Sequence, residues 1–155
     1  MPVDHKLKID EIVYQRELYS KSFIARTFRD FLDRLALEAL KNSEKILDVG
    51  CGEGLLLEKI VSIKKDALVC GIDLSPENVE ICLAHNLSAI LADAKRLPFA
   101  DETFDTCIMT EVIQYLEEEK PQEVIREIAR VLKTNGQLFI MFPNDRNYKV
   151  ARLLT

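Results

Sequence analysis

A glycine-rich segment at residues 48–54, with the sequence DVGCGEG, restricts the fold more than any other feature of this chain. Three glycines at alternate positions pack poorly in a strand or a helix, but they permit sharp turns and let backbone N–H groups approach a ligand. The segment follows the apolar pair Ile46-Leu47, and a helical pattern of apolar residues begins at Leu55. The sequence therefore predicts a strand-to-helix turn whose helix N-terminus points at a bound ligand.

The glycine spacing distinguishes between two kinds of nucleotide-like ligand. The dinucleotide fingerprint is G-x-G-x-x-G, whereas here the third glycine, Gly54, comes one residue early and Leu55 stands where the longer motif would end. An acidic residue, Asp48, precedes the first glycine by two positions, where nicotinamide-binding proteins usually have an apolar residue. An NAD-dependent oxidoreductase is therefore the less favoured interpretation.

The loop resembles motif I of the class I S-adenosylmethionine-dependent methyltransferases, and three further motifs follow in the order of that family. They are Asp73 after the apolar residues 67–72, Asp93-Ala94 after residues 88–91, and residues 97–99 (LPF) leading into Phe104-Asp105. The resemblance covers residues 45–144, about two-thirds of the chain, and is closest to the small-molecule, type 11 group. It implies S-adenosylmethionine as cofactor and transfer of its methyl group to a small-molecule or lipid-like acceptor, with no metal.

The order of strands and helices agrees with that resemblance. Apolar strand patterns alternate with helical ones, at 45–49, 53–63, 67–72, 76–85, 88–91, 106–109, 120–132 and 137–142. This alternation predicts an α/β fold, a Rossmann-like three-layer sandwich with a mostly parallel sheet. Ser75 and Pro76 mark a helix start, and Asn135-Gly136 mark the end of the helix at 120–132.

The chain is predicted to have a helical cap at 1–43 and a cofactor-binding domain at 44–155. In the cap, Ile24, Phe28, Phe31 and Leu35 recur at helical spacing and predict an amphipathic helix that ends near Asn42-Ser43, after a shorter helix at 11–21. The cap either covers the sheet or lies over the cofactor and helps to select the substrate, and the two interpretations are compatible.

The resemblance implies a role for each residue around the cofactor. Asp48 would contact the methionine amino group, although it could instead anchor the glycine loop. Asp73 would bind the ribose hydroxyls, with Leu74 against the adenine, while Asp93 would accept from the adenine amino group. The complete predicted set of cofactor-binding residues is Asp48, Gly50, Cys51, Gly52, Gly54, Asp73, Leu74, Asp93, Ala94, Thr110 and Glu111.

The segment that lines the methyl-transfer face in the family departs from the usual pattern. Many small-molecule members have Glu-His where this chain has Gln114-Tyr115, so a usual candidate base is missing. Tyr115 is the one candidate for a catalytic side chain, but a phenol with a reference pKa of about 10 is a poor base near neutrality. Packing of Tyr115 under the following helix is the alternative.

Composition excludes several other classes of protein. The chain has 155 residues, is 48% hydrophobic and carries a net charge of -5, with no run of Lys or Arg longer than a pair, which argues against a nucleic-acid partner. No apolar stretch reaches membrane length, and the sequence predicts a cytoplasmic protein. Its four cysteines are Cys51, Cys70, Cys82 and Cys107. Their spacing favours reduced, buried thiols over a metal site.

The C-terminal region is expected to be short relative to the family, whose members continue with a helix and an antiparallel strand pair. The strand at 137–142 is apolar and uncharged, and an unpaired strand of this kind promotes association. The chain is therefore expected to be a fragment, to self-associate through this edge, or to cover the edge with residues 148–154. Val150, Leu153 and Leu154 favour the start of an amphipathic helix there. A domain that binds the cofactor without catalysis remains the alternative function.

Overall fold

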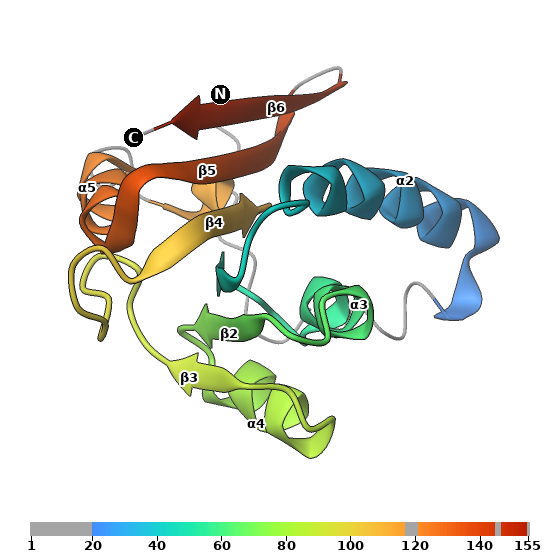
Figure 1. Ribbon diagram of the computed structural model, residues 1–155. Helices are drawn as coiled ribbons and strands as arrows, with labels where there is room; N and C mark the ends of the chain where they lie inside the picture. Colours follow the sequence, from blue (N-terminus) through green and yellow to red (C-terminus); the bar gives the residue numbers. More distant parts are fainter. Residues whose placement is uncertain (1–19, 117–120, 145–146, 155) are drawn as a thin grey trace, which may run out of the picture.

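The computed structural model of the protein describes residues 20–116, 121–144 and 147–154 (Figure 1). Its helices are α2 (Phe23–Ala39), α3 (Leu55–Ile63), α4 (Pro76–Ala84), the 3-10 turn η2 (Ile113–Tyr115) and α5 (Pro121–Val131). Its strands are β1 (Lys45–Val49), β2 (Leu68–Asp73), β3 (Ala89–Leu91), β4 (Phe104–Thr110), β5 (Leu132–Asn144) and β6 (Asn147–Leu154). Strands and helices alternate from β1 to β3 and again from β4 to β5, as the sequence predicts, while β3 connects to β4 without a helix.

The strands form one sheet in the order β3-β2-β1-β4-β5-β6, which can be followed from the bottom to the top of Figure 1. Strands β1 to β5 run parallel, and β6 is antiparallel to β5. The chain moves outward from β1 through β2 to β3 and then returns to place β4 on the other side of β1. The carboxyl ends of β1 and β4 therefore form the switch point at which open α/β sheets bind ligands.

Two apolar cores cover the two faces of the sheet and confirm the three-layer prediction. On one face, Leu32 and Ala36 of α2 pack with Ile60 of α3 and with Ile108 of β4. On the other face, α5 supplies the buried residues Val124, Ile128 and Val131. Helix α2 thus shares a core with the sheet, while the division into a cap at 1–43 and a domain at 44–155 remains a prediction.

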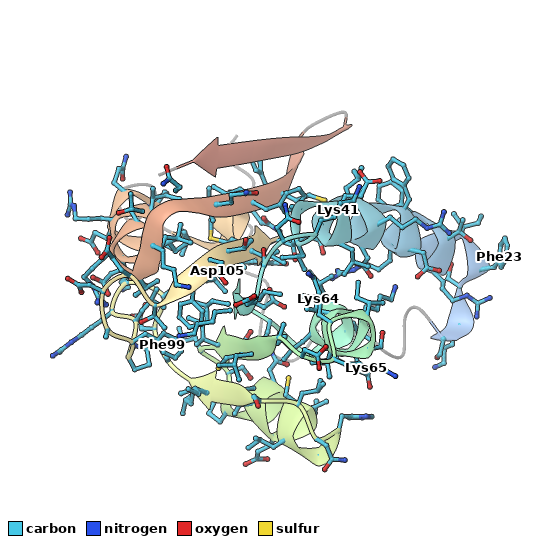
Figure 2. All side chains as sticks on the ribbon, in the orientation of Figure 1. Phe23, Lys41, Lys64, Lys65, Phe99 and Asp105 are labelled. Atoms are coloured by element: carbon cyan, nitrogen blue, oxygen red, sulfur yellow. The ribbon has the colours of Figure 1, made fainter. Side chains whose placement is uncertain are left out.

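Helix α2 buries a different face from the one that its apolar spacing indicates. Ile24 and Phe31 are 80% and 56% exposed, and Phe23 lies at the end of the helix farthest from the sheet (Figure 2). The inward face carries Arg29 and Asp33 beside the buried leucines. Of the predicted stripe, Leu35 packs against the core, but Ile24, Phe28 and Phe31 are exposed. The rest of the stripe is wrong because charged residues that pair with one another can occupy a buried face. The helix also ends earlier than predicted, at Ala39, and most of the helix predicted at 11–21 lies outside the described residues.

The junction of α5 and β5 also differs from the prediction. The helix ends at Val131 and the strand begins at once, with Leu132 paired to Phe104. The register then shifts, and regular pairing resumes where Gln137 meets Thr106. Asn135 has a left-handed backbone, with φ of 64°. The Asn-Gly pair therefore marks an irregularity within the strand and not the end of the helix.

The C-terminal segment forms a strand, and the expectation of a helix at 148–154 is wrong. Residues of β6 pair with β5 from Asn147 opposite Asn144 to Leu154 opposite Gln137. The apolar edge at 137–142 is thus covered by the chain's own segment, which is one of the alternatives considered above. A short connection makes this pairing favourable, because closing a short loop costs little entropy compared with a new ladder of hydrogen bonds.

Candidate cofactor-binding site

The glycine loop between β1 and α3 is fixed by the backbone. Gly50, Gly52 and Gly54 all have left-handed backbones, with φ of 74°, 54° and 78°. The N–H groups of Gly50 and Cys51 both donate to the carbonyl oxygen of Ile72, at 2.8 and 2.9 Å. Since L side chains rarely adopt this conformation, the backbone of the loop favours glycine at all three positions.

The three glycines differ in what surrounds them. A Cβ atom on Gly50 would lie 2.3 Å from the side chain of Val112, and one on Gly54 would lie 2.6 Å from Leu87. A Cβ atom on Gly52 would meet no heavy atom of the described residues within 4 Å. Packing within the protein thus explains two of the glycines, while the space above Gly52 is open and suits the close approach of a ligand.

Asp48 lies in β1 directly before the loop, and its carboxyl group is the least satisfied polar group of the site. The residue is 1% exposed, and both carboxyl oxygens lack a hydrogen-bond partner among the described residues. Burial raises the pKa of Asp48 to about 7, although the nearby Arg29 guanidinium acts in the opposite direction. A buried carboxyl group without partners is costly, so this residue suits a ligand that brings donors or positive charge. It does not anchor the loop.

Asp73, at the end of β2, performs the anchoring that the sequence left open for Asp48. Its Oδ2 atom accepts a hydrogen bond from the N–H of Gly52 at 2.8 Å. Its Oδ1 atom accepts from the N–H of Ser75 and from the amide of Asn78. Ser75 caps α4 by accepting from the N–H of Asn78, and Pro76 follows it, as predicted. A carboxylate has about four acceptor positions, so Asp73 retains room for a donor from a ligand.

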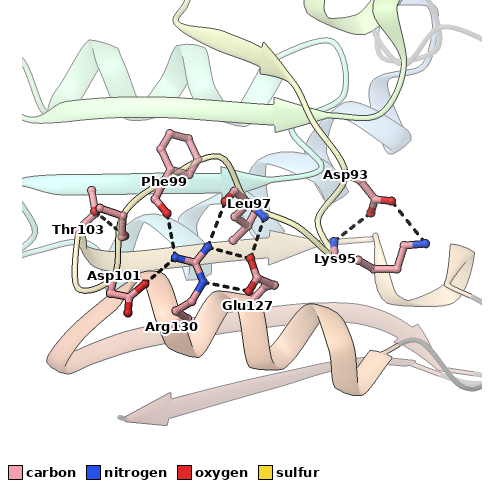
Figure 3. Close-up of polar contacts among 9 residues, drawn as sticks. Asp93, Lys95, Leu97, Phe99, Asp101, Thr103, Glu127 and Arg130 are labelled. Carbon is pink, nitrogen blue, oxygen red and sulfur yellow. Dashed lines mark hydrogen bonds and ion pairs between the residues drawn. The ribbon is translucent and has the colours of Figure 1, made fainter.

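The loop after β3 carries the residues predicted to contact adenine. Asp93 accepts a hydrogen bond from the N–H of Lys95 at 2.9 Å, and its other oxygen lies 3.4 Å from the Lys95 ammonium (Figure 3). Ala94 packs against the core, and Leu74 after β2 is 70% exposed. Asp93 and Leu74 therefore retain surface that a planar ring system could cover.

Arg130 of α5 holds the next part of that loop in place. Its guanidinium donates to the carbonyl oxygens of Leu97 and Phe99 and pairs with Glu127 and Asp101 (Figure 3). Glu127 in turn accepts from the N–H of Leu97 at 2.9 Å. These contacts tie the loop that follows Asp93 to α5.

The segment after β4 closes the other side of the glycine loop. Thr110 is buried, and Glu111 has a left-handed backbone with φ of 58°, while its N–H donates to the carbonyl oxygen of Met141. This geometry brings Val112 against Gly50. Tyr115, in η2, is 72% exposed, so the packed alternative for this side chain is wrong.

Arg29 is the residue that sequence reasoning missed. It comes from α2, is buried, and donates through Nε to Asp33 at 2.8 Å and through Nη1 to Glu111 at 3.1 Å. The arginine and aspartate one helical turn apart gave a local signal of an ion pair. The contact with Glu111, which is 82 positions away in the sequence, gave none.

The thiols do not form part of the ligand surface. All four cysteines are free, and Cys51, Cys82 and Cys107 are buried. The sulfur of Cys51 packs against Gly71, where an added Cβ would lie 2.6 Å away, and it also lies 3.7 Å from the carbonyl oxygen of Gly52. A hydrogen bond with Cys82, together with burial, raises the pKa of Cys51 above its usual range. Within the described part of the chain, no group of three or more His, Cys, Asp and Glu side chains could hold a metal ion.

The fold, the glycine loop and the acids at the ends of β1, β2 and β3 together define a class I methyltransferase domain. The sequence pattern of the methyltransferase domain family matches residues 47–140, and the chain belongs to this family. No helix in the described ranges is both long enough and apolar enough to cross a bilayer.

Three similar proteins illustrate the range of the family. The tRNA (carboxymethyluridine(34)-5-O)-methyltransferase ALKBH8 of Mus musculus is 33% identical over 115 residues, which are 73% of this chain and 17% of that protein. The malonyl-[acyl-carrier protein] O-methyltransferase of Herminiimonas arsenicoxydans is 38% identical over 93 residues, which are 60% of this chain and 35% of that protein. The crystal structure of the PH0226 protein from Pyrococcus horikoshii has a TM-score of 0.72 at 28% identity and covers 81% of this chain and 57% of that one. The chain thus spans less than half the length of these two curated relatives.

Proposed function

We propose that the chain binds S-adenosylmethionine at the carboxyl ends of β1 and β4 and transfers its methyl group to an oxygen atom of a small-molecule or lipid-like acceptor. One observation carries the cofactor assignment. The buried carboxyl group of Asp48 has no hydrogen-bond partner among the described residues, and it lies directly before a loop with open space at Gly52. A cationic ligand that approaches the loop backbone satisfies both features.

The residues of the site fit each part of this cofactor. Asp48 and Glu111 would face the ammonium group, and Gly52 would allow the backbone to approach the ligand closely. Asp73 would use its remaining acceptor capacity for the ribose hydroxyls, and Leu74 and Asp93 would contact the adenine. The bound cofactor supplies an activated methyl group. The protein contributes alignment of the acceptor and exclusion of water.

Oxygen is the proposed acceptor atom because both curated relatives described above carry O-methyltransferase in their names. Charge favours a small or lipid-like acceptor over RNA, since the chain has 26 acidic against 21 basic residues. The nearest labelled basic residues after α2 and α3 are Lys41, Lys64 and Lys65 (Figure 2). They lie near the amino ends of β1 and β2, whereas the glycine loop follows the carboxyl end of β1. They would not supply phosphate contacts at the proposed site.

RNA is the second candidate acceptor, and the similarity to the tRNA methyltransferase is the observation that favours it. Transfer of a radiolabelled methyl group to separate small-molecule, lipid and RNA fractions would distinguish these acceptors. Label that appears in the RNA fraction alone would exclude the small-molecule proposal. Label in no fraction, together with tight cofactor binding, would support the alternative of a domain that binds without catalysis.

Calorimetry on the full chain tests the cofactor directly. We expect binding of S-adenosylmethionine and S-adenosylhomocysteine and no binding of NAD. Asp48→Asn, which removes the charge and keeps the shape, is expected to weaken both interactions. Glu77→Gln, at an exposed acid in the first turn of α4, is the matched control. Binding of NAD without binding of S-adenosylmethionine would overturn the proposal.

A further inference from the structure

Three carboxyl groups and one guanidinium gather at the carboxyl ends of β1 and β4. Glu111 and Asp33 both accept hydrogen bonds from Arg29, and the Arg29 charge also lowers the pKa of Asp48 against the stronger effect of burial. This excess of negative charge suits the ammonium and sulfonium groups of the proposed cofactor. It would repel the cofactor's own carboxylate unless a cation receives that group.

The orientation of the Arg29 side chain is fixed by Asp33 and, through Asp33, by Lys59. Asp33 is almost fully buried, and while its Oδ1 atom accepts from Arg29, its Oδ2 atom accepts from Lys59 of α3 at 2.7 Å. Lys59 also pairs with Asp30 on α2. The guanidinium is therefore held between two helices before any ligand arrives. Such preorganisation reduces the entropy lost when the guanidinium binds a further group.

We propose that Arg29 is a cofactor-positioning residue whose guanidinium binds the α-carboxylate of the methionine end. This inference rests on the proposed function and deepens it, because it makes α2 part of the cofactor site. A guanidinium has five N–H donors in a planar fork that matches a carboxylate, so it can bind more than one carboxyl group at once, as Arg29 does with Asp33 and Glu111. Together with Asp48 for the ammonium, Arg29 would select a complete amino-acid end.

Cofactor fragments allow this role to be separated from a purely structural one. S-adenosylhomocysteine carries both the ammonium and the carboxylate, decarboxylated S-adenosylmethionine lacks the carboxylate, and methylthioadenosine lacks the whole amino-acid end. Arg29→Gln should weaken binding of S-adenosylhomocysteine about 10- to 100-fold, the range expected for a lost hydrogen bond to a charged group. It should leave the affinities for the two carboxylate-free ligands within about twofold, because they make no contact that depends on the charge of Arg29.

Two further variants keep the test decisive. Arg26→Gln, on the same helix, removes an exposed arginine that stacks on Phe23 at 5.7 Å, and it should change none of the three affinities. Arg29→Lys retains the charge without the planar fork and should recover part of the lost affinity. The melting temperature of Arg29→Lys reports whether α2 remains packed against the sheet.

Each outcome of the calorimetry has a defined meaning. An equal loss for all three ligands in Arg29→Gln would show that the residue only holds α2 in place, and it would overturn the inference while leaving the proposed function intact. Unchanged binding of S-adenosylhomocysteine would overturn it in the same way. Failure of the unmodified chain to bind any of the three ligands would instead overturn the proposed function, and this inference with it.

Discussion

The carboxylate of Asp73 accepts a hydrogen bond from the backbone N–H of Gly52 at 2.8 Å, so the end of β2 holds the tip of the loop that follows β1. Asp73 thereby connects two parts of the site, since it anchors the loop and faces the proposed ribose position. Asp48 has the opposite character, because it is nearer to the loop in sequence but holds nothing within the described structure. Asp73 and Asp48 thus have different roles, since Asp73 holds the loop in place and Asp48 is available to a positively charged ligand.

Replacing Asp73 should affect both stability and cofactor binding. Asp73→Ala removes the acceptor for three hydrogen bonds, including the one from Gly52, and we expect the free energy of unfolding to fall by about 1–3 kcal/mol. The affinity for S-adenosylhomocysteine should fall as well. Thermal melting and calorimetry measure the two effects, with Glu77→Gln as control. A variant of normal stability would contradict the anchoring role.

Substitution of Asp48 should have the opposite effect on stability, because the buried charge of Asp48 opposes folding. At pH 8 Asp48→Asn removes a buried carboxyl group that has no partner among the described residues, and we expect it to raise the free energy of unfolding by up to about 4 kcal/mol, from about three pKa units at about 1.4 kcal/mol each. The same substitution should weaken cofactor binding. Denaturant unfolding at pH 8 and pH 4 checks this, since the gain should nearly vanish at the lower pH. A loss of stability at pH 8 would show that Asp48 has a structural role after all.

The free energy of unfolding of the unmodified chain should depend on pH in the corresponding way. Burial raises the pKa of Asp48 from 3.8 to about 7 in the folded chain, so between these values the folded state retains a proton that the unfolded state has lost. The contribution of Asp48 to stability is therefore greatest at low pH and declines as the pH rises from about 4 through 7. Cofactor affinity should change in the opposite direction, because a cationic ligand prefers the ionised carboxylate. Calorimetry from pH 6 to 8 would show it, and Asp48→Asn should abolish the dependence.

The glycine loop and the order of the strands could be predicted from the sequence because both depend on local patterns. Glycines at alternate positions can be recognised within a short stretch of sequence, and so can the apolar runs that indicate parallel strands. The inward face of α2 could not be predicted, since Arg29 and Asp33 are buried only because Glu111 and Lys59 come from other elements to meet them. The different roles of Asp48 and Asp73 could not be predicted either, because the sequence does not show which of the two acids faces Gly52.

Substitutions at two of the glycines should separate ligand contact from packing. Gly52→Val places a branched side chain in open space and should abolish cofactor binding, while stability falls only by the strain of a left-handed backbone, of order 1–3 kcal/mol. Gly54→Val carries the same backbone strain and also drives atoms into Leu87 and Cys82, so its stability should fall further. Melting temperatures and S-adenosylhomocysteine titrations of both variants measure the contrast. Normal cofactor binding by a folded Gly52→Val would remove the loop from the proposed site.

The pairing of β6 with β5 should determine whether the chain associates with itself. Deletion of residues 145–155 would leave the backbone of β5 without its antiparallel neighbour, along the apolar residues 137–142. An unpaired strand edge of this kind is a template for other chains, so the shortened protein should form larger species as its concentration rises. Light scattering at several concentrations would detect them, with the 155-residue chain remaining the smaller species under the same conditions. Equal sizes for the shortened chain and the 155-residue chain would mean that β6 does not protect this edge.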